Sequence, residues 1–121
     1  MASASPYRAV IHVDEDSKEK LTAALRNAYN LLDSVGERNA EVVFVFNVRG
    51  PLTIMKGSVD DYTREQINEL LSMGVRFYVC SISLRSLGIR KEDLIDGVEV
   101  VDSGVKKIVE LERDGYAYIK P

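Results

Sequence analysis

The feature that most constrains the fold of this chain is a regular alternation of short strand-like runs with helical patterns. Residues 7–13 form a mostly apolar run of the kind found in buried parallel strands. Between residues 21 and 35, apolar side chains instead recur every three or four residues, which predicts a helix. The alternation continues to the end of the chain. Strands that alternate with helices are typical of a parallel sheet covered on both faces.

Four further strands and three further helices complete the pattern. We predict strands at residues 41–46, 75–79, 98–101 and 116–120. Asp16 and Glu19 predict a capping box for the first helix. The later helices follow Asp60 or Thr63, Ser81, and Ser103, with one more helical turn at residues 91–95. Residues 47–59 contain turn signals and are predicted to be irregular.

The length of 121 residues fits one domain, which we place at residues 7–121 after a flexible tail at residues 1–6. The predicted fold class is α/β. We expect a three-layer α/β/α sandwich with a five-stranded parallel sheet, flavodoxin-like in its general appearance.

Composition argues against several classes of function. A net charge of −3 does not favour a nucleic-acid surface, which would normally be basic. No apolar run approaches the roughly 20 residues that cross a membrane, and the first residues do not resemble a secretion signal. A single cysteine suits a reducing compartment, so we expect a cytoplasmic protein. The glycine-rich motifs of dinucleotide and P-loop binding are absent from the sequence.

The single cysteine, Cys80, follows the predicted strand at residues 75–79 and precedes a predicted helix. A thiol at a helix N-terminus is close to the positive end of the helix dipole, which favours the nucleophilic thiolate. This sheet edge is also where open α/β folds bind ligands. The alternative is that Cys80 is a small apolar residue packed in the core.

Four other side chains are candidates to support Cys80. Ser81 and Ser83 can cap the helix, and their backbone N–H groups can stabilise a sulfur anion. Arg85 can do the same with its charge, or can be a solvated surface residue. His12 can serve as a base or be a core or interface residue. A lone histidine makes a poor zinc site, and we predict no metal.

Two remaining clusters have simpler interpretations. Residues 14–16 are acidic and follow the first strand, as in receiver domains that bind magnesium, but Cys80 occupies the position of the phosphorylated aspartate. We therefore interpret these acidic residues as capping and surface charges. Tyr116 and Tyr118 share one face of the last strand and either line a subunit contact or pack in the core.

Four segments together resemble the DsrE/DsrF-like family (the DsrEFH superfamily, including YchN-like proteins). They are the opening strand with His12, the asparagine-rich helix at residues 25–32, the strand that ends at Cys80, and the ending at residues 101–121. The ending contains the sequence Gly-Tyr-Ala-Tyr, which is distinctive in combination with the strand–cysteine–helix segment.

The resemblance implies a DsrEFH-like three-layer fold and a homo-oligomer, commonly a homo-trimer or homo-hexamer. In the sulfur-relay members, the cysteine at the position of Cys80 accepts sulfane sulfur as a persulfide and passes it to a partner. This implies a sulfur carrier or sulfurtransferase with donor and acceptor proteins, and no cofactor. The competing hypotheses are a non-catalytic binding or assembly module with an inert Cys80, and a thiol-based redox sensor.

Overall fold

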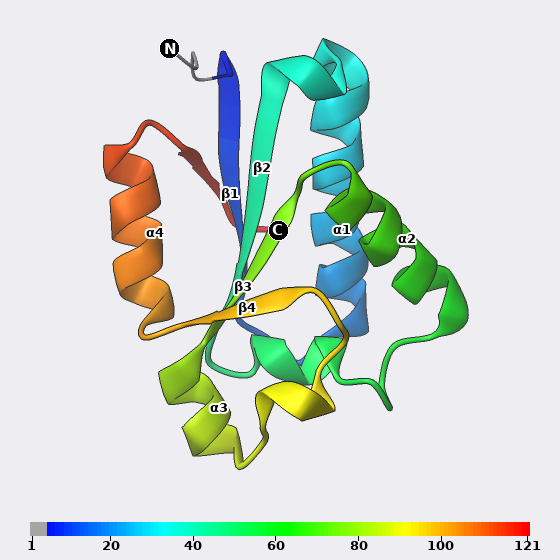
Figure 1. The fold of residues 1–121 in the computed structure, drawn as a ribbon, viewed down its shortest axis with the longest axis vertical. Coiled ribbons are helices and arrows are strands. Elements are labelled where there is room, and N and C mark those ends of the chain that lie inside the picture. Colours follow the sequence, from blue (N-terminus) through cyan, green and yellow to red (C-terminus); the bar gives the residue numbers. More distant parts are fainter. Residues whose placement is uncertain (1–4) are drawn as a thin grey trace.

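Five parallel strands form one sheet at the centre of the computed structural model, which describes residues 5–121 (Figure 1). The strands are β1 (Tyr7–Val13), β2 (Ala40–Phe46), β3 (Arg76–Cys80), β4 (Val98–Val101) and β5 (Ala117–Ile119). The helices are α1 (Lys18–Val35), α2 (Asp61–Ser72), α3 (Ser81–Leu87) and α4 (Gly104–Arg113). Short 3-10 helices lie at Glu37–Asn39, Gly50–Ile54 and Lys91–Asp93. Most of the predicted tail at residues 1–6 lies outside the described residues.

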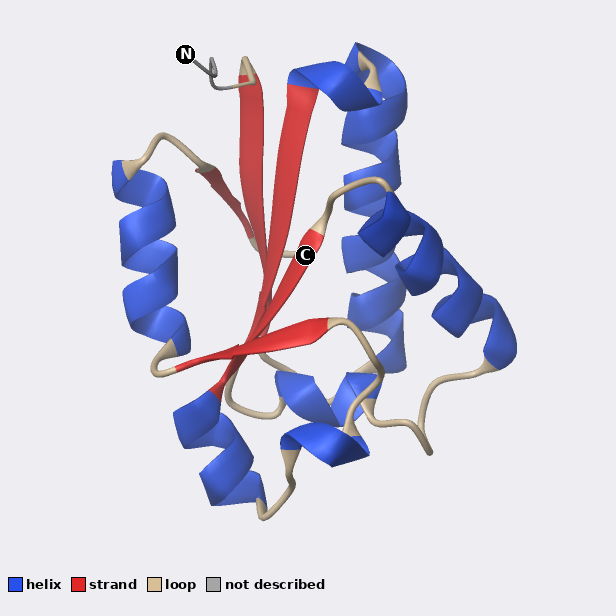
Figure 2. Cartoon of the chain, viewed as in Figure 1, coloured by secondary structure: helices blue, strands red, loops and turns tan. Residues whose placement is uncertain are grey.

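The strand order β4-β3-β2-β1-β5 determines which face each helix covers. From β1 to β4 each strand is added on the same side of the previous one, whereas β5 returns to the far side of β1. Because parallel crossovers are right-handed, this reversal places α4 on the face opposite α1 and α2. Figures 1 and 2 show that arrangement, with α3 beyond the end of β3. The predicted three-layer fold with a five-stranded parallel sheet is confirmed, although the strand order differs from that of flavodoxin.

The larger core lies between the sheet and the helices α1 and α2. Three aromatic rings stack there, with the Phe44 and Phe77 centroids 4.5 Å apart and Phe46 beside both. These three side chains are fully buried. Side chains alternate along strands, so the residues between the phenylalanines point to the other face.

A smaller cluster lies on the α4 face. It consists of Val10, Val43, Val45, Ile108 and Leu111. The helix that covers this face, α4, has ten residues. The apolar core beneath it is therefore small, and polar residues occupy the same face at the carboxyl ends of the strands. The candidate functional residues lie at that end.

The predicted cap of α1 is wrong by one residue. Ser17 is the N-cap, and its Oγ accepts a hydrogen bond from the Lys20 N–H at 3.1 Å. The helix begins at Lys18, so Asp16 lies one position too early and instead pairs with Arg49 at 3.7 Å. The predicted cap Ser103 of α4 is confirmed.

The other elements lie within a few residues of their predicted positions. The last strand is shorter than predicted, since only Ala117–Ile119 pairs with β1. The predicted turn at residues 91–95 is a 3-10 helix at Lys91–Asp93. Across residues 5–121, no helix combines the length and apolar character needed to cross a bilayer.

Candidate functional site

Cys80 is the last residue of β3 and also the N-cap of α3. Its side chain is buried, with 5% of the residue exposed. Gly104, the first residue of α4, lies directly against it. A Cβ added at Gly104 would lie 3.2 Å from the Cys80 Cβ and 3.0 Å from the Asn47 Cβ. The start of α4 therefore packs on Cys80 and Asn47 together, and a glycine permits this close approach.

The surroundings of Cys80 favour its thiolate. Burial raises the pKa of the thiol, but the Ser83 hydroxyl and the backbone N–H groups of Gly104, Ser83 and Ile82 lower it by more. The pKa of Cys80 therefore lies below its usual value. The donors around Cys80 therefore increase the fraction of the thiol that is ionised at a given pH.

The prediction that Ser81 and Ser83 cap α3 is wrong, because no side chain forms a capping hydrogen bond there. Ser83 is buried, and its Oγ accepts a hydrogen bond from the Val48 N–H at 2.8 Å. Its hydroxyl hydrogen is then free to point to the Cys80 sulfur. Ser81 accepts a hydrogen bond from exposed Arg85 at 3.5 Å. Arg85 is not among the groups that lower the pKa of Cys80.

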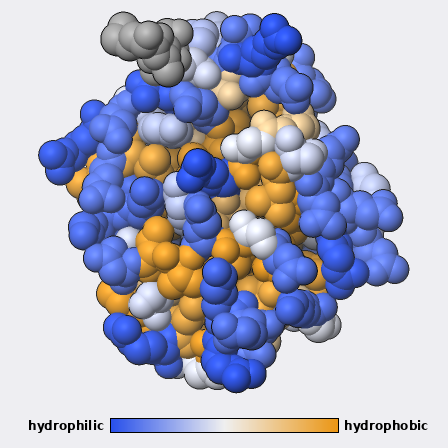
Figure 3. Space-filling model, viewed as in Figure 1, coloured by the Kyte–Doolittle hydropathy of each residue, from blue (hydrophilic) through white to orange (hydrophobic). Residues whose placement is uncertain are grey.

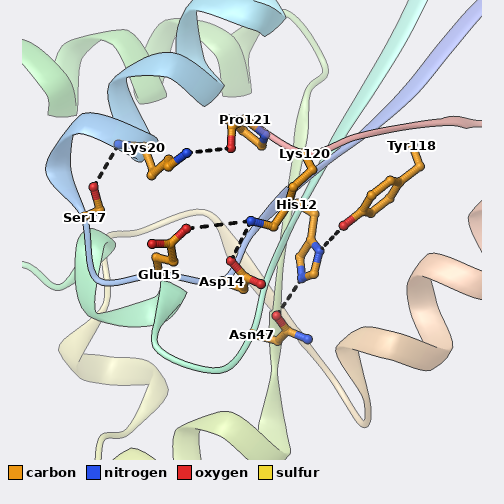
Figure 4. Close-up of polar contacts among 9 residues, drawn as sticks. All are labelled: His12, Asp14, Glu15, Ser17, Lys20, Asn47, Tyr118, Lys120 and Pro121. Atoms are coloured by element: carbon orange, nitrogen blue, oxygen red, sulfur yellow. Dashed lines mark hydrogen bonds and ion pairs between the residues drawn. The ribbon is translucent and has the colours of Figure 1, made fainter.

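His12 forms a short chain of hydrogen bonds with Tyr118 and Asn47 (Figure 4). Its Nδ1 lies 2.6 Å from the Tyr118 hydroxyl, and its Nε2 lies 2.7 Å from the Asn47 Oδ1. The Asn47 Oδ1 can only accept, so Nε2 carries the ring hydrogen and donates to it. In the neutral imidazole, Nδ1 then accepts a hydrogen bond from the Tyr118 hydroxyl.

Asn47 lies next to Cys80 because of strand register. Phe46 pairs with Val79 across β2 and β3, so the next residues, Asn47 and Cys80, are neighbours on the same face. Neighbouring strands are about 4.8 Å apart, which brings the two side chains within contact range. His12 is therefore hydrogen-bonded to a residue that lies beside Cys80, and no sequence pattern had indicated that residue.

The turn after Asn47 is held closely against the site. Val48 has a φ of 54°, which is unusual for a β-branched residue. Its N–H is held by Ser83, and the Gly50 N–H donates to the Asn47 carbonyl at 2.8 Å. A Cβ at Gly50 would lie 2.0 Å from the Val13 carbonyl oxygen, so only glycine fits there. These contacts fix Asn47 between the ends of β1 and β3.

A second set of polar contacts fixes the C-terminal strand. Lys120 Nζ lies 3.0 Å from Asp14 Oδ1 and 3.8 Å from Glu15 Oε2 (Figure 4). Lys20 Nζ donates to the Pro121 carbonyl at 3.2 Å. These acidic residues therefore have a structural role, since they anchor β5 and with it Tyr118. Within residues 5–121, no cluster of three or more histidine, cysteine or acidic residues could hold a metal ion.

Three exposed apolar residues are sequence neighbours of residues at the site. They are Val48 after Asn47, Ile82 before Ser83 and Val105 after Gly104, with 58%, 50% and 62% of their surface exposed. Figure 3 shows apolar atoms gathered over α3 and the neighbouring part of the sheet.

Cys80 lies at the carboxyl end of its strand, as predicted from the sequence, whereas no pattern singled out Asn47, Gly104 or the contact of Tyr118 with His12. A signal for Asn47 was present, because a polar residue that directly follows a buried parallel strand lies at the ligand-binding edge. Gly104 had a weaker signal as the residue after a capping serine. The contact between Tyr118 and His12 depends on β5 lying beside β1, which no local pattern indicates.

Comparison with known proteins relates this chain to one family and to solved structures of the same fold. The model of the DsrE/DsrF-like family matches residues 9–121. A protein of unknown function from Methanobacterium thermoautotrophicum, MTH1491, is 36% identical with a TM-score of 0.85; the match covers 95% of this chain and 99% of that one. The ychN protein from E. coli is 17% identical with a TM-score of 0.76, at the same coverages.

A more distant solved structure has the same fold. A conserved protein of unknown function from Bacteroides thetaiotaomicron, BT1422, is 14% identical with a TM-score of 0.73, and the match covers 100% of both chains. At this identity and that of ychN, the likeness concerns the fold alone. No curated protein matches the chain.

Proposed function

This chain belongs to the DsrE/DsrF-like family, and on that premise we propose that it carries sulfane sulfur as a persulfide on Cys80. The observation that supports the proposal most is the environment of the thiol. Cys80 ends a strand beneath the first residue of α4, and Ser83 and the N–H groups nearby lower its pKa. These are the properties of a sulfur nucleophile rather than of a residue that only fills space.

The proposed transfer step conserves atoms and electrons. The Cys80 thiolate attacks the outer sulfur of a donor persulfide, R–S–SH. A bond forms between Sγ and that sulfur, the donor's S–S bond breaks, and the donor leaves as the thiolate R–S⁻. The sulfur keeps its proton and then releases it to water. Attack by an acceptor thiolate reverses the step, so no oxidant, metal or organic cofactor is required.

The second candidate function is a non-catalytic binding module with an inert thiol. The burial of Cys80 favours it, since 5% exposure is typical of a packed cysteine. The two candidates differ in an observable property: a packed thiol reacts only when the protein unfolds, whereas a carrier reacts while folded.

The proposal includes partners and a compartment. Val105 and Val109 are exposed four residues apart on α4, which supports a homo-oligomer in which this helix meets another copy of the chain. The donor and acceptor would be thiol-bearing molecules that reach Cys80 near Val48 and Ile82. A persulfide on a lone cysteine suits the reducing cytoplasm.

The test is sulfur loading of the folded protein, followed by intact mass. We expect incubation with glutathione persulfide to add one sulfur atom, which a reductant removes. Cys80→Ser should gain none while keeping the same unfolding curve as the original chain. Equal loading of Cys80→Ser would refute the role of Cys80, and no loading of either would favour the binding module.

A further inference from the structure

A groove lies between α1 and α2, the two neighbouring helices on the face of the sheet opposite α4 (Figure 1). It has a volume of about 450 Å³ and is lined by Tyr29 of α1 and by Tyr62, Glu65, Gln66 and Glu69 of α2. Within the part of the chain that the structure describes, this lining combines two aromatic rings with two carboxylates and holds no basic side chain. None of these residues belongs to the thiol site described above.

Tyr29 joins the two helices at the groove. Its hydroxyl donates a hydrogen bond to the Glu69 Oε1 and lies 3.1 Å from the Gln66 carbonyl oxygen. Burial and the bond to Glu69 raise the pKa of the Tyr29 hydroxyl, so the hydroxyl stays protonated as the donor. One carboxylate of the groove is therefore held in place by a bond from the facing helix.

The negative charge of the groove is not neutralised within residues 5–121. Glu65 and Glu69 are four residues apart on α2, where like charges repel each other. Neither forms an ion pair with the described residues, although Asp61, one turn earlier on α2, pairs with Arg64 at 2.9 Å. Asp33 of α1 adds a third negative charge nearby, because it too raises the pKa of the tyrosine that joins the helices. The groove therefore presents charge that a cation from another molecule can neutralise.

Tyr62 presents an aromatic ring to solvent beside these charges. It is 70% exposed, and its hydroxyl accepts only a long hydrogen bond of 3.4 Å from the Gln66 Nε2. A ring next to carboxylates suits a planar cation, because a guanidinium stacks on an aromatic face and pairs with a carboxylate through two N–H groups. Among the described residues, the nearest arginine in sequence to Tyr29 is Arg26, which does not line the groove.

We propose that this groove binds an arginine side chain of a partner protein, with the guanidinium stacked on Tyr62 and paired with Glu65 and Glu69. Charge complementarity selects a basic segment, and the exposed ring favours the planar guanidinium over an ammonium. Because Tyr62 and Glu65 are exposed, the groove is open at the surface, as a side chain carried by another protein requires. The inference goes beyond the proposed function and does not depend on the chemistry of Cys80.

The test is an NMR titration of the isotope-labelled, folded protein with the peptide acetyl-Gly-Arg-Gly-amide. Low ionic strength is used because salt screens exposed charges. We expect saturable shifts of the amide signals of Tyr62, Glu65 and Glu69, with a Kd in the millimolar range because exposed ion pairs are weak. The same peptide with lysine in place of arginine should bind about threefold more weakly. With uncharged citrulline in that place, no saturable shift should remain.

Two substitutions in the groove separate the contribution of the charge from that of the ring. Glu65→Gln keeps the shape and removes one charge, and we expect it to weaken binding about threefold to fivefold. Tyr62→Ala should weaken binding by about threefold, whereas Tyr62→Phe keeps the ring and should bind like the original chain. Glu110→Gln is the matched control, because it removes the same charge from an exposed position on α4, across the sheet. Denaturant unfolding verifies that each variant is folded.

Saturable shifts at the groove that Glu65→Gln and Tyr62→Ala weaken, and that Glu110→Gln leaves unchanged, would support the proposal. It is overturned if the arginine peptide produces no saturable shift at these amides, or if Glu110→Gln weakens binding as much as Glu65→Gln does. Equal binding of the lysine and arginine peptides would overturn the choice of arginine. Dilution of the free protein is the last measurement: shifts of the same amides with protein concentration would assign the groove to a second copy of the chain and overturn the partner protein.

Discussion

The substitution Gly104→Ala tests the contact between α4 and Cys80 most sharply. The added methyl group would lie 3.0 Å from the Asn47 Cβ, 3.2 Å from the Cys80 Cβ and 3.4 Å from the Val45 Cγ1. Overpacking of this kind costs about 1–3 kcal/mol. The gain in helix propensity from alanine offsets at most about 1 kcal/mol. With the full offset, we therefore expect a net loss of about 0–2 kcal/mol in the free energy of unfolding.

The same change affects the chemistry. If α4 moves away to relieve the contact, the Gly104 N–H loses its hold on the sulfur and the pKa of Cys80 rises. The rate of alkylation follows the thiolate fraction, so its pH midpoint moves upward and the rate at neutral pH falls. Denaturant unfolding and the pH profile of iodoacetamide alkylation measure the two effects.

Gly57→Ala is the matched control, since a Cβ at Gly57 meets nothing within 4 Å. It should change neither measurement appreciably. A Gly104→Ala variant as stable as the original, with an unchanged alkylation profile, would show that α4 does not press on Cys80 and would refute this reasoning.

Three further predictions follow from individual contacts. Ser83→Ala should move the pH midpoint of Cys80 alkylation upward, because the Ser83 hydroxyl lowers the pKa of the thiol; an unchanged midpoint would contradict this. The same substitution should lower the free energy of unfolding by about 1–3 kcal/mol in denaturant, because the Val48 N–H loses its acceptor. Ser17→Ala should lower the free energy of unfolding by about 1 kcal/mol through loss of the α1 cap, whereas Asp16→Ala should have little effect. Thermal unfolding compares the two variants, and a larger loss for Asp16→Ala than for Ser17→Ala would show that Asp16 is the cap. Phe77→Ala should cost about 3–5 kcal/mol, because the fully buried ring stacks 4.5 Å from Phe44; a small change in the denaturation midpoint would contradict this packing.

The layers of the fold were predictable because the signals for them are local. The apolar runs of β1 and β2 and the helical spacing of α1 each need only their own residues. Gly36 and Gly88 end their helices with φ values of 87° and 69°, which favour glycine. The same local signals placed Cys80 between a strand and a helix.

The composition of the site was less predictable because it depends on register and strand order. Ser83 has the sequence context of a cap, yet its hydroxyl accepts from Val48, 35 residues away. Tyr118 meets His12 across 106 residues because β5 pairs with β1. Asn47 is the first residue of an irregular loop. Its place in the site becomes visible only from the register of β2 and β3, which sets it beside Cys80. Contacts of this range are invisible to patterns of period two or 3.6.

The central claim is that the fold lowers the pKa of Cys80 and so favours its thiolate, and the pH dependence of its alkylation in the folded protein tests this most directly. The account predicts that iodoacetamide modifies Cys80 without unfolding, with a midpoint below the usual thiol pKa of about 8.5. Modification that occurs only under denaturing conditions, or a folded-state midpoint at or above that value, would contradict the account and leave Cys80 as a packed, inert thiol.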